Sequence, residues 1–182
     1  ARIQASPIEN LNAGAEFCYQ RSKAATKDSN TAILANLGYS FADVAMAPSL
    51  TVDYTRLSKN WNAMLEDITP ADIANVLFPN TNVQCIGATV AAKPMTDLSA
   101  SFRFAALRSV KELSAFANDW ATYTMDGNKR DLGKEYDLHF AYDYTEDVQF
   151  GLMGGLFTPG KAFAPVNRKN ATQVIGSMKV TF

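Results

Sequence analysis

The final segment of the chain alternates between apolar and polar positions. Between Ala171 and Phe182, one set of alternate residues is apolar or small: Val174, Gly176, Met178, Val180 and Phe182. The intervening set contains Ile175, Ser177, Lys179 and Thr181. Successive side chains of an extended chain point to opposite sides, so this period of two predicts a β-strand with one apolar face. A strand of this kind, with a terminal aromatic residue, is typical of the closing strand of a membrane β-barrel.

The same alternation recurs along the chain in segments of about ten residues, the length that a tilted membrane-spanning strand needs. The predicted strands are 11–20, 31–41, 48–57, 83–92, 98–107, 136–144, 148–157 and 172–182. Residues 2–5 also alternate and suggest the tail of a ninth strand. We therefore expect an all-β fold: a single region, 1–182, forming an antiparallel transmembrane β-barrel with eight or nine strands in this chain. Because bacterial single-chain barrels have even strand numbers, the favoured interpretation is the C-terminal portion of a larger barrel of about 16–18 strands. The alternative is a complete eight-stranded barrel.

The connections between these segments alternate in length. Short turns are expected at 42–47, 93–97 and 145–147, and long connections at 21–30, 58–82, 108–135 and 158–170. Bacterial outer-membrane barrels have short periplasmic turns and longer extracellular loops. This pattern predicts a location in the outer membrane of a Gram-negative bacterium, with the long loops extracellular and the short turns and the C-terminus periplasmic.

One long connection contains a helix signal. Thr69, Pro70 and Asp72 match an N-cap hydroxyl, a first-turn proline and an acidic first turn, so a short helix is expected over 71–77, ended by Pro79. Such a helix either folds inward and narrows a pore or lies over the barrel rim. We expect the rim position.

The polar face of the predicted strands carries the charged residues of the segments, apart from Arg56 at a strand end. A Lys or Arg on the lipid face costs ~2–4 kcal/mol at the middle of the membrane, whereas a charge in a water-filled lumen costs little. The residues expected to line the lumen are Glu16, Asp53, Arg103, Asp137, His139, Asp143 and Lys179. They form either the wall of a conducting channel or a polar network that fills a narrow barrel.

Composition limits the chemistry that the chain can carry. No stretch has the ~18 apolar residues of a membrane helix. Cys18 and Cys85 permit one disulfide or two free thiols. One histidine and two distant cysteines do not predict a metal site, and no phosphate-binding glycine motif is present. We expect no cofactor and no enzymatic activity, although His139 with Asp137 on its strand face leaves a barrel hydrolase as an alternative.

The expected partners follow from charge and from the terminal strand. Most of the 17 Lys and Arg residues lie in the long connections, and the formal net charge is −1. A basic outer rim is suited to the phosphates of lipopolysaccharide or to attracting anions. Nucleic acid is not expected, because the basic residues have acidic neighbours. Met178, Val180 and Phe182 are the expected barrel-closing signal for the barrel-assembly machinery, and outer-membrane lipid is expected around the apolar face.

Three stretches resemble a known family. They are 48–54 (PSLTVDY), 91–98 (AAKPMTDL) and 132–138 (LGKEYDL), the last continued by 157–163 (FTPGKAF). Over roughly residues 45–182 the chain is similar to the C-terminal half of the alginate-export family of outer-membrane porins. The resemblance implies a large monomeric barrel that passes polymer or small solute across the outer membrane. In that family the pore is strongly basic, whereas the inferred wall here is mixed in charge.

These observations predict a porin-like channel for the passive passage or export of a polar solute or polysaccharide. Two alternatives are open at the level of the sequence. One is a small plugged eight-stranded barrel with a structural or lipopolysaccharide-binding role. The other is the barrel hydrolase that uses His139.

Overall fold

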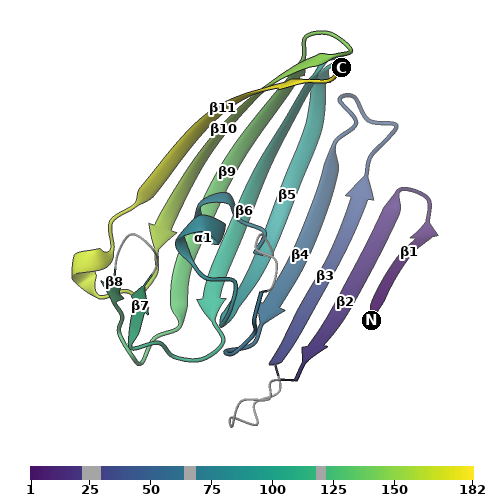
Figure 1. The fold of residues 1–182 in the computed structure, drawn as a ribbon. Helices are drawn as coiled ribbons and strands as arrows, with labels where there is room; N and C mark the ends of the chain where they lie inside the picture. Colours follow the sequence, from purple (N-terminus) through teal and green to yellow (C-terminus); the bar gives the residue numbers. More distant parts are fainter. Residues whose placement is uncertain (22–29, 64–68, 118–121) are drawn as a thin grey trace.

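The computed structural model describes residues 1–21, 30–63, 69–117 and 122–182, and its main element is one nine-stranded antiparallel sheet (Figure 1). The strand order follows the sequence, β1-β2-β3-β4-β5-β6-β9-β10-β11. The strands are β1 (Arg2–Ile8), β2 (Leu11–Gln20), β3 (Asn30–Ser40), β4 (Ser49–Leu57), β5 (Val83–Met95), β6 (Leu98–Ser109), β9 (Asp131–Asp143), β10 (Val148–Pro159) and β11 (Ala171–Val180). In the described part of the chain β1 and β11 are the two edges, so the sheet is not closed into a barrel.

The predicted antiparallel all-β fold and its eight strands are confirmed, and the ninth strand at the start is present as β1. Several strand ends differ from the prediction by one or two residues, and two differ by more. β5 continues to Met95 and β9 begins at Asp131, because both strands keep pairing with β6 beyond the residues where apolar alternation is clear.

Four short connections lie at one end of the sheet and the long ones at the other (Figure 1). The connection predicted at 21–30 lies almost wholly outside the described residues. The other long connections carry the helix α1 (Asp72–Leu77), a small sheet of β7 (Ala115–Ala117) with β8 (Thr122–Thr124), and a 3-10 turn at Pro165–Asn167. The small sheet was not predicted from the sequence. None of the helices in the described ranges is long and apolar enough to span a membrane.

The strand register separates the residues of the sheet into two faces. One row crosses all nine strands through directly paired residues: Ile8, Leu11, Tyr39, Leu50, Val90, Phe102, Leu138, Gly154 and Val174. Every member is apolar or glycine, and Leu138 and Phe102 are 42% and 46% exposed. We call this side the apolar face. The opposite side, which we call the inner face, carries all seven residues predicted to line a lumen.

The hydrophobic core lies on the inner face, at the end where the long connections are. Leu57, Val83, Leu107 and Phe157 are at most 2% exposed there. The ring of Phe157 contacts that of Phe78, just after α1, with 5.5 Å between the ring centres. The helix therefore packs on the concave side of the sheet, against β9, β10 and β11 (Figure 1). Its expected position over a barrel rim was wrong, because its apolar residues and its N-terminal amides both find partners on the inner face.

The two cysteines are free. Cys18 lies on β2 and Cys85 on β5, with β3 and β4 between them. Strands in a sheet are ~4.8 Å apart, so three such spacings exceed the ~7 Å limit between Cα atoms of a disulfide. The alternative of a disulfide between them is therefore wrong in this structure.

Candidate functional site

An ion pair crosses three strands at the centre of the inner face. The guanidinium of Arg103 on β6 donates to both carboxylate oxygens of Asp53 on β4, at 2.7 and 2.9 Å. Gly87 on β5 lies between them, and a Cβ at that position would overlap the guanidinium. The absence of a side chain at Gly87 thus lets Arg103 reach over β5. Both charged side chains are 15% exposed, so the pair is largely removed from water.

The same arginine holds the segment that leads into α1. Its Nε donates to the carbonyl of Pro70 at 2.7 Å, and its Nη1 also donates to the hydroxyl of Thr89 at 2.9 Å. Five N–H donors are available on a guanidinium, and this geometry commits four bonds to internal partners. Arg103 therefore ties β4, β5 and the α1 segment together.

A buried carboxylate from the sheet caps α1. Glu135 on β9 is fully buried, and its two oxygens accept the backbone N–H groups of Ile73 and Ala74, both at 2.7 Å. The first amides of a helix lack partners within the helix, so a carboxylate placed there satisfies them. The predicted capping by Thr69 was wrong: the helix begins at Asp72, and the Thr69 hydroxyl donates to Asn80 at 2.7 Å instead.

The packing beneath α1 is close. A Cβ on Gly155 of β10 would lie 3.0 Å from Cδ1 of Ile73 and 2.9 Å from an oxygen of Asp137. Asp137 is fully buried, and its two oxygens find no hydrogen-bond partner among the described residues. It shares the inner face with Glu135, two residues away on the same strand. Gly155 thus provides the space in which Ile73 approaches the sheet.

His139 is the third sheet residue that reaches α1. Its Nε2 lies 2.8 Å from Oδ2 of Asp72, within ion-pair range. Ser101 is the residue paired with His139 on the neighbouring strand, but no hydrogen bond joins their side chains in the described ranges. The geometry therefore holds His139 toward the helix rather than toward a serine nucleophile. The predicted hydrolase stays a prediction with no nucleophile contact to support it.

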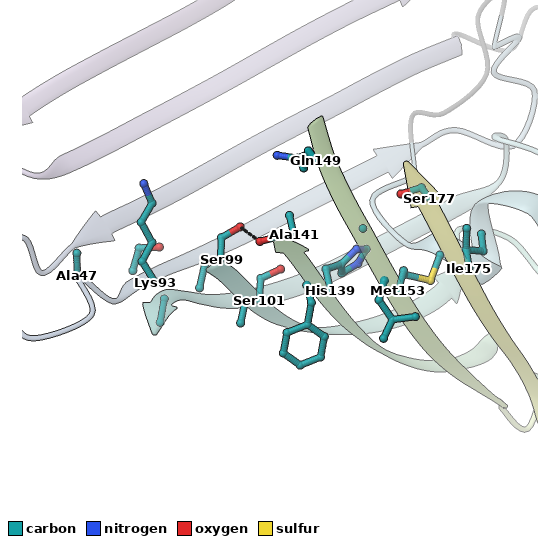
Figure 2. Close-up of a pocket in the computed structure, with 17 residues that line it drawn as sticks. Ala47, Lys93, Ser99, Ser101, His139, Ala141, Gln149, Met153, Ile175 and Ser177 are labelled. Carbon is teal, nitrogen blue, oxygen red and sulfur yellow. Dashed lines mark hydrogen bonds between the residues drawn. The ribbon is translucent and has the colours of Figure 1, made fainter. Parts of the chain in front are cut away.

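Toward the short turns, the inner face is hollowed into a groove of about 470 Å³ (Figure 2). Two neighbouring rows of the register form its floor. The first row is Ser49, Ala91, Ser101, His139, Met153 and Ile175, and the second is Ser99, Ala141, Gly151 and Ser177. We call this the serine groove.

Of the seven predicted lumen residues, the structure brings together Asp53, Arg103, Asp137 and His139 around α1. The remaining three lie apart from them on the same face. Glu16 is 3.9 Å from Arg2 and accepts from the Cys18 thiol at 3.3 Å. Asp143 accepts from the Gln149 amide at 2.7 Å, and Lys179 is paired with Gln149 in the register.

Sequence reasoning missed Glu135, Asp72 and the Pro70 carbonyl as partners of these residues. A signal for Glu135 existed, because it precedes Asp137 by two residues and so lies on the same strand face. Within the described ranges no group of three or more His, Cys, Asp or Glu residues is arranged to hold a metal ion.

The likeness to the alginate-export porins rests on segments that the structure assigns to the sheet. Residues 49–54 belong to β4, residues 91–98 span the turn between β5 and β6, and residues 132–138 belong to β9. These segments belong to the sheet and do not identify a solute, so the likeness stays a prediction. No protein-family model matches the chain, and no curated protein matches it at a significant level.

Proposed function

We propose that this chain forms part of an outer-membrane β-barrel channel through which a polar solute passes passively. The observation that carries the proposal is the apolar face: it runs across nine paired strands, and its large side chains are exposed. Contiguous exposed apolar area on this scale is rare on a soluble monomer and marks a surface that another phase or partner covers. Lipid is the covering that suits a continuous sheet face whose middle rows carry no charge. The charged residues Arg56, Arg108 and Lys134 lie on this face only at strand ends next to the long connections.

Strand length supports the same proposal. β5 and β9 have 13 residues each, and β6 and β10 have 12. A membrane strand tilted by ~45° needs ~9–11 residues to cross the hydrocarbon core. These four strands are long enough to cross it and to extend beyond it on the side of the long connections, where α1 and the core lie.

A channel of this kind requires more strands than the sheet contains. In the bilayer core an unpaired backbone amide costs several kcal/mol, so an open edge is not stable there. The edges at β1 and β11 must therefore be paired in the membrane. We propose that further strands close the sheet into a barrel of about 16–18 strands, as the resemblance to the alginate-export porins implies.

One observation favours a second candidate function, a plugged barrel with a structural or lipopolysaccharide-binding role. α1 is held on the inner face by a fully buried carboxylate and an apolar contact with the sheet. Such an inward segment narrows the lumen of a wide barrel and blocks that of a small one. The number of strands that close the sheet thus decides between the two functions.

Planar-bilayer recording of the full-length protein tests the proposal. We expect stepwise ionic currents from the native protein, and larger steps when residues 59–81 are replaced by a short turn between Leu57 and Val83, which are paired residues. Currents only after the replacement would favour the plugged barrel. Silence from both proteins, with β-sheet content retained in vesicles, would end the channel proposal.

A further inference from the structure

The serine groove has the shape and chemistry of a binding site for a small polar molecule. Its volume of about 470 Å³ is within the range of ligand pockets, which is ~300–1,000 Å³. Strands β4, β5, β6, β9, β10 and β11 all contribute to its lining. The inference below rests on the proposed function, because it takes the inner face to be the surface that a solute meets.

The hydroxyl groups of the groove are free to bind a ligand. Ser49, Ser101 and Ser177 make no side-chain hydrogen bond among the described residues, and Ser99 makes only a long one, 3.4 Å, to the carbonyl of Ala141. A hydroxyl both donates and accepts, which matches the hydroxyls of a sugar or polyol. The absence of a side chain at Gly151 leaves room for the Ser177 hydroxyl, because a Cβ at that position would overlap it.

The other end of the groove is apolar. Met153 and Ile175 are paired across β10 and β11, beside Ser177 (Figure 2). A saccharide presents C–H groups as well as hydroxyls, so a wall with serines and an aliphatic strip can contact both kinds of surface. A simple inorganic ion has no apolar surface that could pack against such a strip.

Apart from Lys93, the cationic groups near the groove already have partners, which argues against an anionic ligand. Arg103 is bound to Asp53 and to the Pro70 carbonyl, so its guanidinium cannot clamp a carboxylate. Nε2 of His139 lies 2.8 Å from Oδ2 of Asp72. Lys93, at the short-turn end, is the one remaining cation among the residues that line the groove.

We propose that the serine groove binds a neutral polyhydroxylated solute, of the size of a mono- or disaccharide, in preference to a uronate. The solute's hydroxyls exchange hydrogen bonds with Ser49, Ser101 and Ser177, and its C–H surface lies on Met153 and Ile175. Recognition is weak, as a channel requires, because binding must not prevent release.

Titration calorimetry with maltose tests this inference on the full-length protein, in a detergent without a sugar headgroup. We expect maltose to bind and glucuronate to bind at least tenfold more weakly. Replacing Ser101 and Ser177 together by alanine removes two neutral hydrogen bonds and should weaken maltose binding about tenfold or more.

Two glycines of β10 give a matched pair of variants. Gly151→Ala displaces the Ser177 hydroxyl and should weaken maltose binding several-fold. Gly154→Ala lies on the apolar face, meets nothing within 4 Å, and should leave maltose binding unchanged. Equal affinities in both variants and the native protein would overturn the assignment, and so would tighter binding of glucuronate than of maltose.

The outcome separates this inference from the proposed function. Maltose binding by a protein that carries no current would support the proposed ligand site and refute the proposed channel function. The opposite outcome is a protein that carries current, does not bind maltose in calorimetry and shows no reduction of current by maltose. That outcome would support the channel function and refute the ligand site.

Discussion

Replacing Glu135 by glutamine tests whether the buried carboxylate holds α1 on the inner face. In the native protein each of its oxygens accepts one amide, from Ile73 and from Ala74. A glutamine side chain has only one such oxygen, so its NH₂ group would face an N–H donor. The substitution keeps the size of the side chain and removes half of the acceptor capacity.

The expected cost follows from these two bonds. A hydrogen bond to a charged group is worth about 1.5–3 kcal/mol, and an orphaned buried donor costs about 1–3 kcal/mol. Replacing the carboxylate also removes its repulsion with the buried Asp137, which offsets part of the loss. We therefore expect the docking of α1 to weaken by about 1–3 kcal/mol, which is about a 5- to 150-fold rise in the undocked population.

Amide hydrogen exchange measures that population directly. A peptide covering residues 70–78 should exchange about 5- to 150-fold faster in Glu135→Gln, while peptides of β9 and β10 keep their native protection. Glu112→Gln is the control, because Glu112 forms a half-exposed ion pair with Arg130 at 3.5 Å and does not touch α1. Unchanged exchange of 70–78 in Glu135→Gln would refute the capping role, and equal acceleration over the whole sheet would show a global effect instead.

Three further outcomes are expected. Arg103→Met leaves the largely buried Asp53 without a partner and should lower the free energy of unfolding by about 3–5 kcal/mol in urea titrations. Adding Asp53→Asn to Arg103→Met removes the unpaired charge and should recover part of this stability. Leu138→Lys on the apolar face should cost about 2–4 kcal/mol of folding into lipid vesicles, and Ser101→Lys on the inner face far less, by tryptophan fluorescence; equal costs would contradict the lipid-facing assignment. Phe157→Ala, at 1% exposure against Phe78, should lower stability by about 3–5 kcal/mol in the same urea assay, and a loss under 1 kcal/mol would show that this core does not stabilise the fold.

The strands were predictable because a single physical rule governs them. Alternation of apolar and polar residues fixes which side chains share a face, and β2 was obtained from it with both ends correct. The rule becomes weaker where the register of a strand is irregular. At the start of β9, Leu107 pairs with Gly133 and Arg108 with Asp131, so Leu132 is an extra residue and the alternation is interrupted there.

The site was less predictable, because its contacts join residues far apart in the sequence. Asp53 and Arg103 were both assigned to the inner face, but 50 residues separate them, and only the register brings Gly87 between them. Likewise, the partner that caps α1 is 62 residues from Ile73, whereas local sequence offered Thr69. Local propensity indicated that a helix forms there, and only tertiary contact determines where it lies.

The register irregularities of the main sheet all occur close to strand ends, between Ala5 and Ile8, between Ala92 and Met95, and between Leu107 and Arg108. The middle of each strand therefore contains no bulge that could accommodate an inserted or deleted residue. Deleting one residue near Leu138 would shift the register of half of β9 by one residue against both β6 and β10. The apolar residues of that half would then lie on the inner face, and its charged residues on the apolar face. Gains and losses of residues during evolution should accordingly be confined to the connections, while the wall changes only by substitution.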